Sequence, residues 1–145
     1  MILVDSNILV YAINKTSPKT NKAENFLRSF AGGFVLAHQN ILESLRVLTH
    51  PKFPKPMKLK SAIAEIQKIA DAGRIISPDY RTYHIAAELI KNYSLKSDQI
   101  FDAYLVATAL TNDVYKIATD NERDFLKIEE IKVINPFKGD EKKES

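Results

Sequence analysis

The chain of 145 residues contains no cysteine. This absence excludes a disulfide scaffold, a cysteine nucleophile, and zinc or iron–sulfur sites built on cysteine. Disulfides are typical of oxidising compartments, so a chain without them agrees with a reducing one. We therefore expect a cytoplasmic protein.

Long apolar runs are missing as well. No segment approaches the ~20 consecutive apolar residues that a membrane-spanning helix needs, so no membrane partner is expected. The first 14 residues are largely apolar, but they lack a basic leading segment and carry Asp5 among them. This pattern indicates a part of the folded domain rather than a signal peptide.

The composition that is present is that of an ordinary folded domain. Apolar residues make up 45% and charged residues 27%, and the length suits one domain with a substantial core. The net charge of +3 is unevenly placed: residues 1–75 hold 11 Lys and Arg against 5 Asp and Glu, and residues 76–145 hold 10 against 13. A basic half that meets a polyanion and an acidic half that holds cations is one interpretation, and ordinary surface variation is the other.

Short apolar runs alternate with longer segments of helical periodicity. The runs predict strands at residues 1–5, 34–37, 75–76, 114–118 and 131–134. The periodic segments predict helices at residues 8–13, 17–33, 39–49, 59–72, 83–93 and 99–110, with Ser6 or Asn7 capping the first. Strands that alternate with helices predict an α/β fold with a central, mainly parallel sheet flanked by helices. Residues 138–145 carry no large apolar side chain and are expected to be a disordered tail.

Acidic residues fall where such a fold binds ligands. Asp5 ends the first strand, and Asp120 and Asp124 follow the strand at 114–118, which places them at the carboxyl edge of the sheet. Glu43 and Asp102 lie inside otherwise apolar helices, where carboxylates are seldom buried without a partner. Each has an ordinary alternative: Asp5 as a helix cap, and Glu43 as a side chain that reaches solvent. Asp102, like Asp98 four residues before it, could be a charge that favours a helix N-terminus, and Asp120 and Asp124 could belong to a polar turn.

Several carboxylates in one place repel one another unless they take up protons or a cation. Two unit charges ~4 Å apart repel by about 4 kcal/mol at an effective dielectric constant of ~20. Hard oxygen ligands without histidine or cysteine favour Mg²⁺ or Mn²⁺. A divalent ion held in this way can activate water against a phosphodiester.

Four motifs in order resemble those of the PIN-domain ribonucleases, and more narrowly the VapC-type toxins of toxin–antitoxin pairs. A fifth short match closes the series, and together they cover about residues 1–137. The matching segments are Met1–Ala12, Asn40–Thr49, Phe101–Ala109, Ala118–Phe125 and Val133–Pro136.

The resemblance implies a PIN-like nuclease domain over residues 1–137 that cleaves RNA with Mg²⁺ or Mn²⁺. Asp5, Glu43 and Asp102 match the acidic positions that bind the metal in that family. The resemblance also implies a homodimer and a cognate antitoxin that inhibits the enzyme.

The fourth acid is less clear from the resemblance. Many relatives have an aspartate two residues after the position of Thr119, where this chain has Asn121. We therefore assign the role to Asp124 and keep Asp120 in reserve. Asn7 and Thr119 lie in the same motifs and are expected to hydrogen-bond the acids and fix their orientation.

A basic loop is a candidate nucleic-acid-binding segment. Lys52, Lys55 and Lys58 lie among three prolines with Phe53 between them, and no acidic residue interrupts the run. Lysines attract phosphates without reading sequence, and an aromatic ring can stack on an unpaired base. A loop that is simply solvated is the alternative. Arg46 either contacts the scissile phosphate or pairs with Glu43, three residues before it on the same predicted helix.

Three other functions are compatible with parts of the pattern. A non-catalytic PIN-like module that binds RNA or a protein would tolerate an incomplete set of acids. An aspartyl-phosphate phosphatase also begins with an aspartate after its first strand, but it needs a second one at the position of Asn7. A nuclease directed at DNA shares the phosphodiester chemistry.

Overall fold

A five-stranded parallel sheet forms the centre of the molecule, in the strand order β3-β2-β1-β4-β5. The structure is a computed structural model and describes residues 1–138. The strands are β1 Ile2–Val4, β2 Phe34–Ala37, β3 Arg74–Ile76, β4 Lys116–Ala118 and β5 Lys132–Ile134. The helices are α1 Ser6–Ile13, α2 Thr20–Ser29, α3 His38–Leu48, α4 Leu59–Asp71, α5 Thr82–Tyr93 and α6 Gln99–Thr111.

Alternating side chains on the central strands build two cores on opposite faces of the sheet. Ile2 and Val4 of β1 belong to the core on one face, with residues of α1 and α2. Leu3, between them, belongs to the core on the other face, with residues of α5 and α6. Helices cover a parallel sheet on both faces, which is why its central strands are apolar at every position. The predicted α/β class is confirmed.

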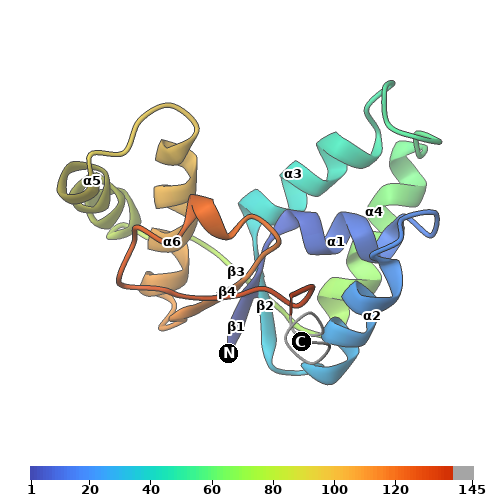
Figure 1. Ribbon diagram of the computed structural model, residues 1–145, viewed down its shortest axis with the longest axis horizontal. Helices are drawn as coiled ribbons and strands as arrows, with labels where there is room; N and C mark the ends of the chain where they lie inside the picture. Colours follow the sequence, from blue (N-terminus) through green and yellow to red (C-terminus); the bar gives the residue numbers. More distant parts are fainter. Residues whose placement is uncertain (139–145) are drawn as a thin grey trace.

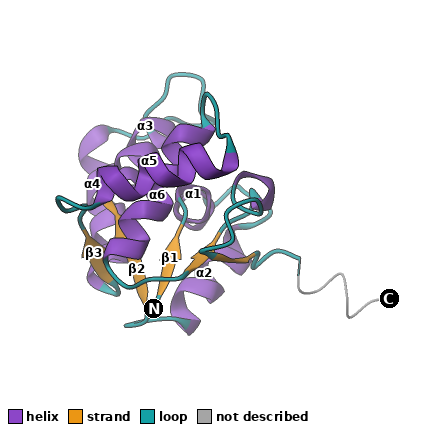
Figure 2. Ribbon diagram, turned by 90° about the vertical axis from the view of Figure 1, so that its left-hand side faces the viewer, coloured by secondary structure: helices purple, strands orange, loops and turns teal. Residues whose placement is uncertain are grey.

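The connections between strands create one point where the chain changes direction. Helices α1 to α4 lie on one side of the sheet and α5 and α6 on the other (Figures 1 and 2). The chain runs outward from β1 to β2 and β3, and then returns to β4 on the opposite side of β1. In open α/β sheets ligands bind at the carboxyl ends of the strands beside such a reversal. The carboxyl ends of β1 and β4 are therefore the first place to look for a site.

Most element boundaries differ from the sequence prediction by one or two residues, and α2 is shorter than the predicted helix at 17–33. Two of the differences have clear local reasons. The prediction that Ser6 or Asn7 caps the first helix is wrong, because the helix begins at Ser6 and the Asp5 side chain accepts its N–H. Strand β4 begins at Lys116 rather than 114, because the Val114 N–H still donates to the Ala109 carbonyl in the turn that ends α6 (2.9 Å). The tail predicted at 138–145 lies outside the described residues from residue 139 onward.

None of the helices found in residues 1–138 has the length and apolar character to cross a bilayer.

Candidate active site

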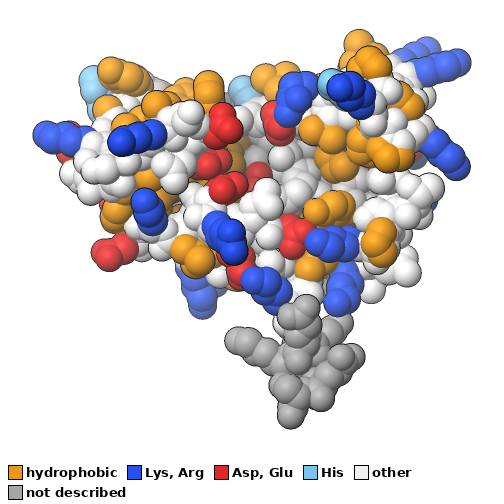
Figure 3. Space-filling view, turned by 45° about the horizontal axis from the view of Figure 1, so that its top comes forward, with side chains coloured by type: hydrophobic (Ala, Val, Ile, Leu, Met, Phe, Trp, Pro, Cys, Tyr) orange, Lys and Arg blue, Asp and Glu red, His pale blue; other side chains and the backbone are white. Residues whose placement is uncertain are grey.

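A pocket of about 690 Å³ opens at the carboxyl end of the sheet, between α1, α3 and α6. Acidic side chains gather around the hollow in the middle of this face (Figure 3). The structure thus brings to one pocket the four acids that the sequence singled out, together with a fifth. These are Asp5, Glu43, Asp98, Asp102 and Asp124.

Asp5 is fixed at the centre of the pocket by groups on both neighbouring elements. It ends β1 and caps α1, with its Oδ1 accepting the Ser6 N–H at 2.8 Å. Its Oδ2 accepts the Thr119 hydroxyl at 2.8 Å and the Asn7 amide at 3.3 Å. The helix-cap alternative and the site assignment therefore describe the same carboxylate, because one oxygen caps the helix and the other joins the network.

The network around Asp5 matches the supporting role that the sequence suggested for Asn7 and Thr119. The Asn7 amide also donates to the Thr119 hydroxyl oxygen (3.2 Å), which accepts the Asn121 N–H as well (3.0 Å). Burial raises the pKa of Asp5, and the hydrogen bonds from Thr119 and Ser6 act against that rise. Thr119 is fully buried, so β4 holds this hydroxyl in a fixed position.

Replacing Thr119 by valine should lower the free energy of unfolding by about 1–2 kcal/mol, because the Asn121 N–H and the Asp5 oxygen lose a partner in partly buried hydrogen bonds. Denaturant unfolding of the purified variant measures this loss. Thr108→Val is the matched control, because Thr108 is also buried but donates only to the Tyr104 carbonyl within α6. An equal loss in the two variants would contradict a special role for Thr119.

Asp102 is a second carboxylate of the pocket whose pKa is raised. It lies in the first turn of α6, and burial raises its pKa to about 7, with further contributions from Asp124, Asp5 and Asp98. The pocket therefore concentrates negative charge without enough positive charge to balance it, as expected of a place that binds a cation.

Asp98 is a pocket residue that the sequence did not identify. Its position before α6 suggested a charge that favours the helix N-terminus, but its side chain makes no capping hydrogen bond and lines the pocket instead. It lies one helical turn before Asp102, on the same face of the chain, and this spacing is the signal that could have revealed it.

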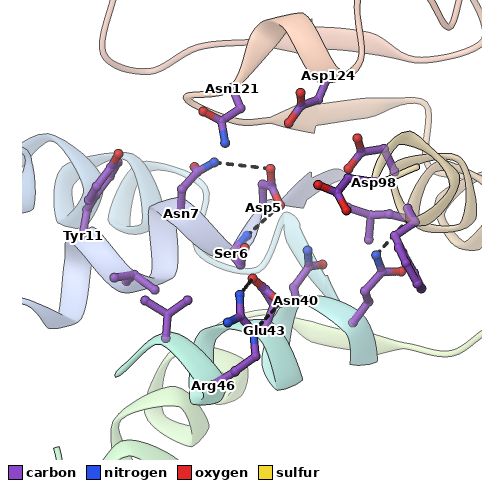
Figure 4. A pocket seen from close by; sticks show the side chains of 16 residues that line it. Asp5, Ser6, Asn7, Tyr11, Asn40, Glu43, Arg46, Asp98, Asn121 and Asp124 are labelled. Atoms are coloured by element: carbon purple, nitrogen blue, oxygen red, sulfur yellow. Dashed lines mark hydrogen bonds and ion pairs between the residues drawn. The ribbon is translucent and has the colours of Figure 1, made fainter. Parts of the chain in front are cut away.

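Glu43 reaches the pocket from α3, but it is engaged with a neighbour on the same helix. Arg46 donates to both of its carboxylate oxygens, from Nε at 3.2 Å and from Nη2 at 2.5 Å. Figure 4 shows this pair on one side of Asp5, with Asn121 and Asp124 on the opposite side. Of the two interpretations of Arg46, pairing with Glu43 is the one that the structure contains.

Both candidates for the fourth acid, Asp120 and Asp124, lie in the loop after β4, but only one of them faces the pocket. Asp124 ends a short 3₁₀ helix, Glu122–Asp124, and lines the pocket together with Asn121. Asp120 does not line it. Its carboxylate accepts hydrogen bonds from Lys19, Tyr11 and Asn135. Burial alone would raise the pKa of Asp120, but the hydrogen bonds from Lys19 and Tyr11 lower it. The negative charge of this carboxylate is therefore already compensated by Lys19.

The predicted RNA-binding lysines lie away from the pocket. None of Lys52, Lys55 and Lys58 lines it, and their loop connects α3 to α4 at the far end of α3 (Figure 1). Arg46 is the residue of the predicted RNA-binding group that does line the pocket.

The donor atoms of the pocket fit a hard divalent cation. Carboxylates and amides line it and neither histidine nor cysteine does, which is the ligand chemistry that Mg²⁺ and Mn²⁺ prefer. Within residues 1–138, however, no three acidic or histidine side chains stand close enough together to enclose an ion. Because both oxygens of Glu43 face Arg46, binding an ion through all of these acids requires Glu43 to turn.

Comparison with known proteins identifies the family. The model of the PIN domain matches residues 2–131. The chain belongs to the PIN domain family. The resemblance expected from the sequence motifs is therefore confirmed.

Individual relatives of this PIN domain share a quarter of its residues or slightly more. Ribonuclease VapC48 of Mycobacterium tuberculosis is 27% identical over 144 residues, which cover 93% of this chain and 97% of the relative. Ribonuclease VapC37 of the same organism is 25% identical over 128 residues, 84% and 89% of the two chains.

Solved structures share the fold at lower identity. VapBC2 of Rickettsia felis, bound to a DNA fragment from its promoter, has a TM-score of 0.70 at 20% identity and covers 93% of this chain and 98% of that one. A toxin–antitoxin complex from Klebsiella pneumoniae has a TM-score of 0.69 at 20% identity, over 94% and 98%.

Proposed function

We propose that this PIN domain is a Mg²⁺- or Mn²⁺-dependent endoribonuclease and the toxic component of a toxin–antitoxin pair. The observation that carries the proposal is the pocket at the strand reversal, into which separate elements bring the carboxylates of Asp5, Glu43, Asp102 and Asp124. The relatives named ribonuclease VapC support RNA as the substrate. Because that substrate lies in the cytoplasm, we propose that the protein acts there.

Asp5, Glu43, Asp102 and Asp124 are the residues that would hold the metal. A divalent ion in this place supplies positive charge for the phosphate and lowers the pKa of water. Thr119 and Asn7 hold the Asp5 carboxylate in one orientation. Asn121 adds an amide to the wall of the pocket without adding charge.

Cleavage of RNA by the purified chain tests the proposal directly. A labelled RNA should be cut internally with Mg²⁺ or Mn²⁺ and left intact with EDTA. A DNA of the same sequence, incubated in parallel, tells a ribonuclease from a nuclease that accepts either sugar. No cleavage with any divalent ion would favour a non-catalytic module that binds RNA or protein, and would contradict the enzyme.

We further propose a homodimer and a cognate antitoxin as partners. The Klebsiella pneumoniae structure is a toxin–antitoxin complex, which supports a protein inhibitor for this chain. For the dimer, the supporting feature is a pair of exposed apolar side chains on two helices that line the pocket. Leu42 of α3 and Phe101 of α6 are 65% and 66% exposed. The Gln39 amide donates to the Phe101 carbonyl at 3.0 Å and brings these two helices together.

The double variant Leu42→Asp, Phe101→Ser should shift a dimer to monomer, because it replaces one exposed apolar side chain by a charge and removes the ring of the other. Sedimentation equilibrium measures the change. Leu126→Asp is the control, because Leu126 is equally exposed (65%) and belongs to neither α3 nor α6. A wild-type chain that is monomeric throughout would contradict the dimer.

The lysines of the loop 50–58 should add affinity for RNA without specifying sequence. Changing Lys52, Lys55 and Lys58 together to alanine should weaken RNA binding and flatten its dependence on salt, because each lost phosphate contact lowers the slope by about 0.7 for a single strand.

The control for the loop variant removes charge from another surface. Lys116 and Lys132 are exposed at the starts of β4 and β5, so Lys116→Ala, Lys132→Ala should leave the salt slope unchanged. If the loop variant binds RNA as the wild type does, these lysines have no part in holding the substrate.

A further inference from the structure

The ion pair of Glu43 with Arg46 occupies the carboxylate that the proposed metal requires. Both residues line the pocket and lie three positions apart on α3. Two nitrogens of the guanidinium face the two carboxylate oxygens, so the pair is bidentate (Figure 4). A cation that binds Glu43 through the lone pairs that face Arg46 must displace Arg46 first.

This displacement is energetically easy. The Arg46 and Glu43 side chains are 63% and 44% exposed, so water screens the attraction between them. Exposed pairs at this spacing shift a helix equilibrium by about twofold only, which a doubly charged ion readily overcomes. The pair is therefore a weak and reversible restraint rather than a permanent structural bridge.

The guanidinium of Arg46, once released from Glu43, can bind a phosphate instead. The planar fork that fits a carboxylate also fits a phosphate, and arginine stays charged at every relevant pH. Arg46 would then face a pocket in which a bound cation has neutralised the acids that otherwise repel a phosphate. The metal thus changes Arg46 from a partner of Glu43 into a potential ligand of the substrate.

We propose that Arg46 is an exchangeable counter-ion: it holds Glu43 while the metal is absent, and it binds a substrate phosphate once a divalent ion takes Glu43. This inference rests on the proposed metal-dependent nuclease. It predicts that metal and substrate bind with positive coupling, because each favours the state in which the pair is open.

NMR of the arginine Nε–H groups tests the exchange without measuring activity. The Arg46 signal, assigned by its loss in Arg46→Lys, should move as Mg²⁺ is added and should half-saturate together with the backbone amides of Asn121 and Asp5. It should move again when the dinucleotide UpU is added to the Mg²⁺-loaded protein, and not when UpU is added without Mg²⁺. Arg81 is the internal control, because its Nε–H is paired with Asp79 outside the pocket and should not respond.

The affinity for Mn²⁺ gives a second measurement. Arg46→Gln should bind Mn²⁺ about fivefold more tightly than the wild type, since it lacks both the competitor for Glu43 and a positive charge beside the ion. Lys68→Gln removes the lysine paired with Glu65, which has the same spacing on α4, and should bind Mn²⁺ as the wild type does.

The outcomes separate the exchange from the function on which it rests. If Mg²⁺ moves the signals of Asn121 and Asp5 but leaves that of Arg46 unchanged, the exchange is overturned and the metal site stands. The same holds if Arg46→Gln and the wild type bind Mn²⁺ equally. If no pocket signal responds to Mg²⁺ or Mn²⁺, the exchange and the proposed function are overturned together.

Discussion

Replacing Asp5 by asparagine should lower the rate of RNA cleavage by a factor on the order of 10² to 10³, while the protein stays folded. The loss is expected because Asp5 is the central carboxylate of the pocket, and an amide cannot supply its charge to a metal. Folding should survive because asparagine caps a helix as well as aspartate does. The measurements are single-turnover cleavage in saturating Mg²⁺ and thermal unfolding of the same sample.

Two further substitutions make the result specific. Asp113→Asn is the control for a lost carboxylate, since Asp113 is exposed and has a positive φ of 58° that asparagine tolerates. It should cleave like the wild type. Asp124→Asn should resemble Asp5→Asn, because Asp124 lines the pocket. Wild-type cleavage by Asp5→Asn would refute the assignment of the carboxylates to metal binding.

The sequence was sufficient for the fold because its local patterns agree with one another. The apolar runs at Ile2–Val4 and Phe34–Ala37 have no polar position, which is the pattern of strands covered on both faces. What the sequence could not decide were the ends of elements, which depend on individual hydrogen bonds. It left Asp5, Ser6 and Asn7 all open as caps of α1, and it did not reveal the Val114 turn after α6.

The sequence predicted which acids belong to the candidate site, but not which of them have hydrogen-bond partners in the folded protein. Strand order brings Asp5 and Asp124 together, and the motifs gave no information on which acids already have a partner. Only the structure shows that Lys19 and Tyr11 occupy Asp120, because this pairing depends on packing between segments far apart in the sequence. The pair of Glu43 with Arg46 was one of two interpretations that their spacing on one helix allowed, and the structure decides between them.

Without metal, the variant Asp102→Asn should be more stable than the wild type at pH 8 by about 2 kcal/mol. Burial and the charges of Asp124, Asp5 and Asp98 raise the pKa of Asp102 from 3.8 to about 7, so ionising it opposes folding. A shift of this size corresponds to about 4 kcal/mol for a fully buried group, and solvent screening of a partly exposed carboxylate reduces it to about half.

The pH dependence of this gain has a definite sign. The folded state binds the Asp102 proton more tightly than the unfolded state, so the wild type loses stability as the pH rises from about 4 to about 7. The advantage of Asp102→Asn should therefore be full above pH 7 and fade toward pH 4. Urea unfolding in EDTA at several pH values measures it, with Asp113→Asn as the control that shows no trend. Saturating Mg²⁺ should reverse the order at pH 8, because the ion stabilises the wild-type carboxylate and gains less from an amide. A pH-independent difference between the variant and the wild type would show that Asp102 is not forced to ionise in a crowd of like charges.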